Sequence, residues 1–298
     1  MSERPVNHAR AAEHFLEDKP HLQFHDERLW DMRQKRDAQM HILPEWQELR
    51  EEASRIKEHT LSRLPEYLEQ FEENAKKNGI HVHWARDGAE HNRIVGEILK
   101  AHGAHNLIKS KSMVTEECDM RPYLEKQGVR VTETDLGERI QQLDDQLPSH
   151  IVVPAVHKLT SDVAKIFAKD YNTDPNIRDP HLLAEAQRQA ARPVILGADS
   201  GMTGGNFFVA ETGTFVVCTN EGNADLSATV PNLHIATIGI ERLVPRMADL
   251  GVFVRLLSRS ALGSPITQYT THFRGPQKGG EMHVVLGDNG RSARLGME

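Results

Sequence analysis

The feature that most constrains the fold is an alternation, from Ile80 onward, of short extended segments with amphipathic helical ones. Residues 81–85 alternate in polarity as a strand does, and further extended segments are predicted at 106–109 and 128–133. A continuous apolar run at 150–154 is typical of a buried parallel strand. Strands that alternate with helices of about 10 to 15 residues favour an α/β fold with a mostly parallel sheet flanked by helices.

The second half of the chain continues this pattern. Two short runs of aromatic and β-branched residues, separated by a tight turn, indicate a hairpin at 207–210 and 214–218. Beyond it the polarity pattern predicts a buried strand, a helix and two late strands, at 234–240, 241–250, 266–273 and 281–286. Ligands of parallel sheets gather beyond the carboxyl ends of the strands, so the polar loops at that edge are where a site is expected.

Two of these loops carry candidate residues. Lys109, Lys111 and Ser112 follow a predicted strand and precede a helix, where ammonium and hydroxyl groups would hold a carboxylate or phosphate. Solvated lysines beside a polar turn are the alternative. His157 with Lys158 follows the apolar run and offers a candidate base, although a histidine there is often satisfied by a backbone carbonyl.

A third candidate is the glycine-rich stretch at 197–226, whose glycines permit positive φ or a close backbone approach. Glu211 lies in the hairpin turn and would act as a nucleophile or base if it is buried. It would otherwise cap a turn. Asn220 and Asn223 add polar groups after the hairpin.

The first 70 residues are predicted to form a helical extension before an α/β domain at 71–298. Glu, Lys, Arg, Gln and His dominate this region, and apolar residues recur at helical spacing from Trp46 to Phe71. We expect this stripe to pack on the main domain or on another subunit. Five histidines between residues 8 and 41 have no carboxylate or cysteine partners at ligand spacing, so no metal site is predicted.

Composition and motifs argue against several classes of protein. The formal net charge of −7 argues against a general nucleic-acid binder, which needs a basic surface. No run approaches the roughly 20 apolar residues that span a bilayer. The N-terminus also lacks the apolar core of a signal peptide, so a cytoplasmic location is expected. Two cysteines, Cys118 and Cys218, form no recognisable disulfide, zinc or iron–sulfur pattern, and the glycine spacings predict neither NAD nor ATP binding.

Several motifs occur in one order along the chain, namely KSMVTEE, ETDLGE, PSHIVVPAVHK, ETGT and TNEGN at 111–117, 133–138, 148–158, 211–214 and 219–223. With later motifs at 239–245, 259–261 and 288–292, this set resembles the lactate utilization protein B family over nearly the whole chain. The resemblance implies a LUD domain of the NagB/RpiA/CoA-transferase-like α/β fold, preceded by a helical extension. It also implies a cytoplasmic complex with sister lactate-utilization subunits that oxidises L-lactate to pyruvate.

Members of that family continue, beyond a segment like 288–298, into a ferredoxin-like module whose cysteine motifs hold two 4Fe-4S clusters. This sequence ends before any such cysteine, and a cluster needs about four thiolates. We therefore expect no cofactor in this chain, which is either truncated or works with an electron carrier on a partner.

The first functional hypothesis is a crevice that binds a small carboxylate substrate. Its predicted residues are Lys111, Ser112, Lys158, Asn220 and Asn223 for binding, and His157 and Glu211 for catalysis. The alternatives are an acyl- or CoA-transferase that uses Glu211, suggested by fold analogy, and a non-catalytic scaffold that docks sister subunits through its helical N-terminus.

Overall fold

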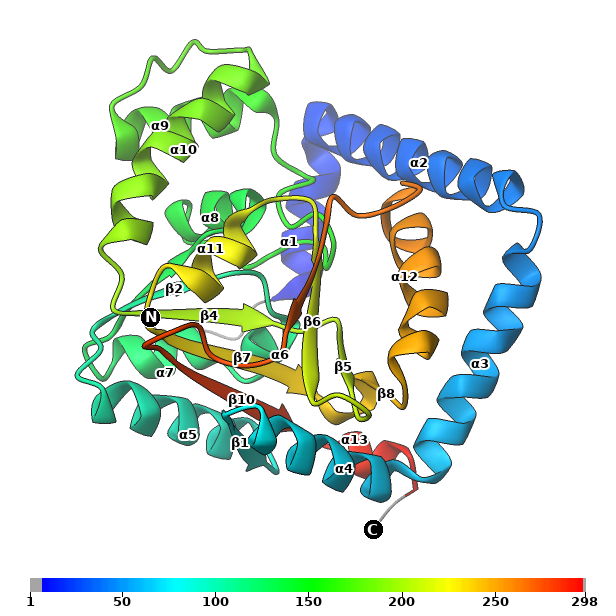
Figure 1. The fold of residues 1–298 in the computed structure, drawn as a ribbon. Helices are drawn as coiled ribbons and strands as arrows, with labels where there is room; N and C mark the ends of the chain where they lie inside the picture. The colour runs from blue at the N-terminus through cyan, green and yellow to red at the C-terminus, as the bar shows by residue number, and fades with distance from the viewer. Residues whose placement is uncertain (1–6, 297–298) are drawn as a thin grey trace.

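A six-stranded, wholly parallel sheet forms the centre of the protein (Figure 1). The computed structural model describes residues 7–296. From edge to edge the strands are β1 (Ile80–Ala85), β10 (Glu281–Gly287), β7 (Leu233–Gly239), β4 (Ser200–Gly204), β2 (Asn106–Lys109) and β3 (Arg130–Glu133). The predicted α/β fold with a mostly parallel sheet flanked by helices is confirmed.

A second sheet of four strands lies beside the first. Its order is β8 (Leu243–Val244), β5 (Phe207–Val209), β6 (Thr214–Thr219) and β9 (Tyr269–Phe273). The β5 and β6 strands form the predicted antiparallel hairpin, in which Phe208 lies opposite Phe215. Both rings are fully buried between this sheet and the central one, so the hairpin belongs to the core.

Helices cover both faces of the central sheet. One face is covered by α5 (Gly88–Ala101) and α7 (Met120–Glu125), and the other by α4 (Leu64–Lys77), α11 (Asn223–Thr229) and the second sheet. The remaining helices are α1 (His8–Glu17), α2 (Lys19–Ile42), α3 (Trp46–Ser62), α6 (Met113–Glu117), α8 (Leu136–Leu143), α9 (Thr160–Tyr171), α10 (Pro180–Leu196), α12 (Met247–Leu262) and α13 (Arg291–Arg294). Over residues 7–296, no helix has both the length and the apolar character needed to cross a bilayer.

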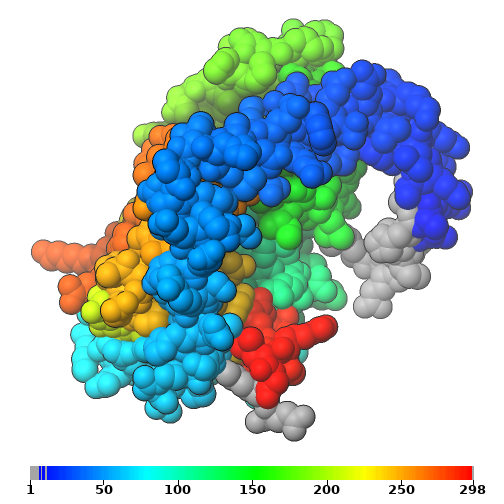
Figure 2. Space-filling view, turned by 90° about the vertical axis from the view of Figure 1, so that its right-hand side faces the viewer, coloured from blue at the N-terminus to red at the C-terminus, as the bar shows by residue number. Residues whose placement is uncertain are grey.

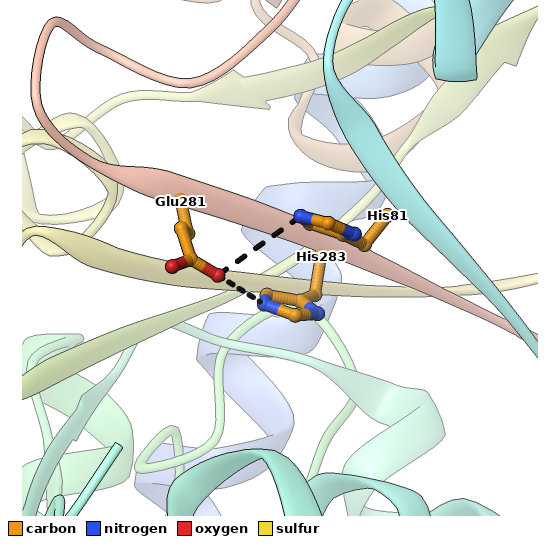
Figure 3. A group of neighbouring side chains, drawn as sticks. All are labelled: His81, Glu281 and His283. Carbon is orange, nitrogen blue, oxygen red and sulfur yellow. Dashed lines mark ion pairs between the residues drawn. The ribbon is translucent and has the colours of Figure 1, made fainter. Parts of the chain in front are cut away.

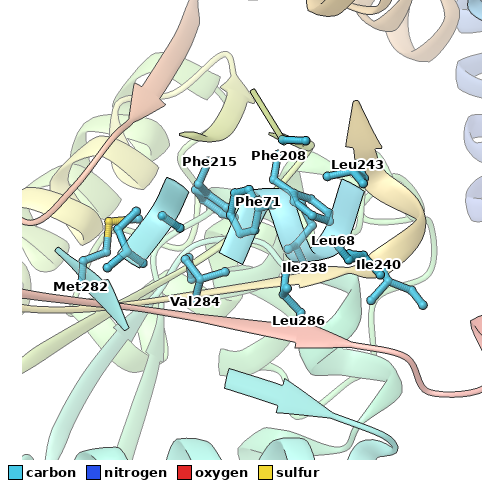
Figure 4. Close-up of a cluster of buried hydrophobic side chains, with 14 of the residues drawn as sticks. Leu68, Phe71, Phe208, Phe215, Ile238, Ile240, Leu243, Met282, Val284 and Leu286 are labelled. Carbon is cyan, nitrogen blue, oxygen red and sulfur yellow. The ribbon is translucent and has the colours of Figure 1, made fainter. Parts of the chain in front are cut away.

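Strand β10 shows how the pleat divides the core between the two faces. Within 282–286, alternate side chains beginning with Met282 point toward α4 and the second sheet, whereas Val285 points toward α5. The strand is therefore apolar on the α4 side along its length, whereas its other face is apolar only at Val285 and carries Glu281 and His283 at its start. Figure 4 shows the cluster on the α4 side, where the rings of Phe71 and Phe208 meet edge-on with 4.7 Å between centroids.

The N-terminal helices pack on the α/β domain of the same chain. Leu64, Leu68 and Phe71 of α4 lie in the core, and α2 and α3 both pack against α12. The predicted apolar stripe therefore covers the main domain, and the predicted boundary at residue 70 falls inside α4. In Figure 2, α2 and α3 form a continuous band along the surface.

The apolar run at 150–154, predicted as a buried strand, is a loop instead. The His150 ring nitrogen Nδ1 accepts hydrogen bonds from the Val152 and Val153 amides at 3.0 and 3.2 Å. Such local bonds between side chain and backbone compete with strand pairing. The Ile151 side chain, which a buried strand would enclose, is 63% exposed.

The helix predicted at 241–250 is wrong over its first half. A 3-10 turn at Ile240–Arg242 leads into β8, which pairs with β5, and α12 begins only at Met247. Pro245 disfavours helical conformation in the residue before it, so the chain stays extended there. From Met247 onward the helical prediction is confirmed.

We expect Leu64→Ala to lower the free energy of unfolding by about 2–5 kcal/mol, because Leu64 is 1% exposed inside the core. Leu182→Ala is the matched control on α10, where the side chain is 56% exposed, and it should change stability by less than about 0.5 kcal/mol. Urea denaturation followed by circular dichroism measures both. Equal effects of the two substitutions would contradict a core position for α4.

Candidate functional site

The strand order reverses between β2 and β4, and a crevice is expected where their carboxyl ends meet. From β2 the chain moves outward to β3, and from β3 it crosses back to β4 on the other side of β2. Ligands of open α/β sheets bind at such a reversal. The groups at this edge are the loop 110–112 after β2, Thr134 and Asp135 after β3, and Gly204 at the end of β4.

Two glycines let the surrounding elements approach β4 more closely than a side chain would permit. A Cβ atom on Gly204 would lie 2.7 Å from the Lys111 carbonyl oxygen, and one on Gly201 would lie 1.6 Å from the Ser227 carbonyl oxygen. Only glycine fits such approaches without moving the backbone. Strand β4 therefore contacts the Lys111 loop at its end and α11 along its length.

Lys109 ends β2 with a side chain that is 0% exposed and an ammonium surrounded by three carboxylates. Its Nζ lies 2.9 Å from Glu133 Oε2, 3.1 Å from Glu116 Oε1 and 3.5 Å from Glu138 Oε2. Burial alone would lower the pKa of Lys109, but the three carboxylates raise it above its usual range. The ammonium is occupied within the protein, so the prediction that Lys109 contacts a bound anion is wrong.

One ammonium cannot neutralise three carboxylates, so the cluster also holds a proton. Glu133 and Glu138 are both buried, and neither Glu138 oxygen has a hydrogen-bond partner among the described residues. Burial, opposed by the attraction of Lys109 and reinforced by the neighbouring Glu138 carboxyl, raises the pKa of Glu133 to about 8. A cavity of about 20 Å³ beside Glu133, Glu138 and Gln141 has room for a water molecule.

Lys111 lies two residues beyond Lys109, with a half-buried side chain. Its Nζ donates a hydrogen bond to the Val152 carbonyl at 2.9 Å, in the loop 148–158 that covers this edge. Burial lowers the pKa of Lys111, and the charge of Asp135 opposes that shift. Among residues 7–296, no carboxylate lies within ion-pair distance of this ammonium, whose hydrogen-bond partner is a neutral carbonyl.

Glu221 and Asp135 bring negative charge near Lys111 from two other loops. Glu221 follows β6, and Asp135 caps α8 by accepting the Glu138 amide at 3.1 Å. The residue Glu221 is exposed as a whole, but partial enclosure of its carboxyl and the charge of Asp135 raise its pKa to about 7. Glu221 therefore exchanges a proton close to neutral pH.

Ser112 and Asn223 lie at the same edge. Ser112 is buried and caps α6, its Oγ accepting the Thr115 amide at 3.4 Å. Asn223 begins α11, and its Nδ2 donates to Thr134 Oγ1 at 3.3 Å. Its Oδ1 is buried and has no hydrogen-bond partner within the described part of the chain. The structure thus brings together three predicted residues, Lys111, Ser112 and Asn223.

His157 and Lys158 are engaged within the loop that covers the crevice. The ring nitrogens of His157 lie 2.7 Å from Ser149 Oγ and 3.2 Å from Gln146 Oε1. Lys158 forms an ion pair with Asp144. Both side chains therefore brace this loop.

Asn220 and Glu211 make structural contacts elsewhere. Asn220 Oδ1 accepts the Gln268 amide at 3.2 Å, and Glu211 Oε2 accepts the Met247 amide at 2.8 Å at the start of α12. Glu211 and Glu221 flank opposite ends of β6, and six extended residues span roughly 17–20 Å. The structure does not bring Glu211 to the crevice.

Comparison with known proteins places this architecture in a family. The LUD domain profile matches residues 68–292, a range that contains every crevice residue described above. The chain belongs to the LUD domain family. The resemblance found in the sequence is thereby confirmed.

This LUD domain protein is similar to longer curated proteins, of which the match covers about half. Lactate utilization protein B of Shouchella clausii (strain KSM-K16) is 44% identical over 265 residues, which cover 86% of this chain and 55% of that protein. A protein named uncharacterized electron transport protein YkgF, from Escherichia coli (strain K12), is 41% identical with the same two coverages. The chain thus spans about 55% of the length of these relatives.

A solved structure of a DUF162 family protein from Deinococcus radiodurans is also similar to this LUD domain protein. The alignment covers 75% of this chain and 98% of that one, at 14% identity and a TM-score of 0.39.

Sequence reasoning missed five members of the LUD domain crevice, which are Glu133, Thr134, Asp135, Glu138 and Glu221. A signal for four of them was present, because the ETDLGE motif begins on the last residue of an extended segment whose carboxyl end lies at the same edge of the sheet. Polar residues at the carboxyl end of β3 indicate a site at this edge as strongly as the lysines after β2 do.

The cysteines of this LUD domain do not fit an iron–sulfur cluster. The sequence holds two, Cys118 at the end of α6 and Cys218 in β6. Burial raises the pKa of both thiols to about 11, which favours the protonated form. Because a 4Fe-4S cluster needs about four thiolates, no chemistry in this chain is assigned to one.

Glu133→Gln should flatten the dependence of stability on pH. The folded-state pKa of Glu133, about 8, lies above its ordinary value of 4.5, so the folded protein holds an extra proton between these values. The stabilisation linked to that proton is present at low pH and is lost as the pH rises toward 8. Urea denaturation at several pH values between about 5 and 8 would measure the slope.

The matched control is Glu125→Gln, at an exposed position on α7, which should keep the wild-type slope. A wild-type slope in Glu133→Gln would contradict a shared proton in the Lys109 cluster.

Proposed function

We propose that this chain supplies the LUD portion of a lactate utilization protein and binds a small 2-hydroxy carboxylate, L-lactate, in the crevice beside Lys111. In this proposal it acts in a cytoplasmic complex whose sister subunits accept the electrons when L-lactate is oxidised to pyruvate. Several relatives at 42–44% identity carry the name lactate utilization protein B, and another is named as an electron transport protein. These names support the substrate class.

The observation that carries the proposal is the position and pairing of Lys111. Its ammonium is half-buried at the strand-order reversal, and its hydrogen-bond partner is a neutral carbonyl. An incoming carboxylate would gain a charge-assisted hydrogen bond there, in a setting with less water than the open surface. Lys109 offers no such contact, because carboxylates of the protein surround its ammonium.

The acidic groups near Lys111 suit a hydroxyl group better than a second carboxylate. In its ionised form Glu221 would accept a hydrogen bond from the substrate hydroxyl, and the unpartnered Asn223 Oδ1 offers another acceptor. Oxidation of a 2-hydroxy acid releases the hydroxyl proton together with two electrons and a second proton. A carboxylate with a pKa near 7 is matched to accept one of these protons at neutral pH.

The roles predicted for His157, Lys158, Asn220 and Glu211 remain predictions. We propose that His157 and Lys158 act by holding the covering loop over Lys111, through their contacts with Ser149 and Asp144. Glu211 keeps its carboxylate on the first amide of α12, a capping role.

Lys111→Met should weaken L-lactate binding by about ten- to hundredfold, because a hydrogen bond to a charged group contributes roughly 1.5–3 kcal/mol. Isothermal titration calorimetry on the full chain measures this. Lys126→Met, at an exposed position at the end of α7, is the matched control and should bind as wild type does. L-Lactate binding that survives Lys111→Met unchanged, or that is absent from the wild-type chain, would overturn the proposal.

L-Lactate binding should strengthen as the pH falls from about 8 to 6. Glu221 has a pKa raised to about 7, and its protonation removes a negative charge that repels the bound carboxylate. The carbonyl oxygen of the protonated carboxyl, or of a glutamine, still accepts a hydrogen bond from the substrate hydroxyl, so that contact is kept. Glu221→Gln should therefore bind at pH 8 about as well as wild type binds at pH 6. A pH dependence that persists unchanged in Glu221→Gln would show that another group controls it.

A further inference from the structure

A cluster of histidines and one glutamate lies at the opposite end of the central sheet from the Lys111 crevice. His81 of β1 is in register with His283 of β10, and Glu281 precedes His283 by two residues. Side chains two apart on a strand, and side chains in register on neighbouring strands, share one face of the sheet. Figure 3 shows all three converging there. His102, at the end of α5, reaches the same group.

The candidate ligand atoms of the cluster lie close together, although somewhat farther apart than the ligands of a bound zinc ion. Glu281 Oε2 lies 3.6 Å from His283 Nε2 and 3.9 Å from His81 Nε2. The candidate ligand atoms of the three residues all lie within 4.8 Å of one another. Ligands placed about 2.0–2.2 Å from a tetrahedral zinc ion would be separated by roughly 3.3–3.6 Å.

His283 supplies an independent sign that a ligand belongs here. Its side chain is 8% exposed, and its Nε2 is buried without a hydrogen-bond partner among the described residues. Its other nitrogen, Nδ1, lies 3.0 Å from His83 Nε2. If Nδ1 donates to His83, the lone pair of His283 Nε2 is directed to Glu281. Metal-binding histidines commonly use their second nitrogen as such an orienting donor.

In His102, too, one ring nitrogen is held by the protein and the other faces Glu281. Its Nδ1 lies 2.8 Å from the Ile98 carbonyl, which can only accept, so Nδ1 carries a proton. In the neutral ring Nε2 then has a lone pair, 3.2 Å from the carboxylate oxygen of Glu281. Two lone pairs at this distance repel unless a proton or a metal cation lies between them.

We propose that His81, Glu281 and His283 bind one divalent zinc-type cation, with Nε2 of His102 or a water molecule completing the coordination. Two or three imidazoles with one carboxylate suit zinc, cobalt or nickel, whereas calcium and magnesium prefer oxygen ligands. His81 and Glu281 are more than half exposed, so the site is open to solvent on one side. The bound cation would tie the edge strand β1 to β10.

The test uses the full chain without a histidine tag. Titration with zinc by calorimetry should show one site per chain that is removed, or weakened at least about tenfold, by Glu281→Gln and by His81→Ala. Cobalt(II) bound there should give visible absorption bands that both substitutions abolish. Because both side chains are exposed, the variants should fold, which circular dichroism would verify.

His272→Ala is the matched control, since it removes an exposed histidine of β9. It should bind zinc and cobalt as wild type does. The proposal is overturned if wild type binds no zinc, or if the zinc site is equally strong in Glu281→Gln and His81→Ala. In either case the cluster is a group of histidines in contact with Glu281 and with one another, without a metal ion.

Discussion

The arrangement of the crevice depends on one buried charge, the ammonium of Lys109. Removing a lysine from water is costly, and here the cost is offset because carboxylates from β3, α6 and α8 converge on it. A buried ion cluster of this kind adds little net stability compared with apolar packing. Its effect is to fix the carboxyl ends of β2 and β3 relative to the helices that follow them.

This arrangement produces two carboxyl groups whose pKa values lie near neutral pH. They differ in their access to solvent. Glu133 is sealed beside Lys109, so its proton is part of the folded structure. Glu221 reaches solvent beside Lys111, so its proton can be exchanged during binding. The buried Lys109 cluster is separate from the exposed charges around Lys111. Glu221 can therefore gain or lose a proton without disturbing the sheet.

Local periodicity predicts five of the six strands of the parallel sheet, the β5–β6 hairpin and most helices, because alternation of polarity reflects which faces are buried. It misses the central strand β4, whose glycines are interpreted as part of a glycine-rich site. It fails at 150–154, where His150 satisfies backbone amides that a strand would pair. Periodicity also fails to predict the burial of Lys109. A lysine at a strand end is usually exposed, and the carboxylates that surround this one come from other segments of the chain. Glu211 is the opposite case. Its place in a glycine-rich turn predicts a functional site, but its carboxylate caps α12.

The position of β10 has a consequence for how the chain folds. Among the strands of residues 7–296 it is the last in sequence, yet it lies between β1, the first, and β7. Until Gly287 leaves the ribosome, β1 has no neighbour to pair with, and α4 lacks part of the core it covers. Pairings this distant in sequence slow folding and prolong the exposure of unpaired strand edges. The N-terminal helices and β1 therefore complete their folding only after the chain has been synthesised beyond Gly287.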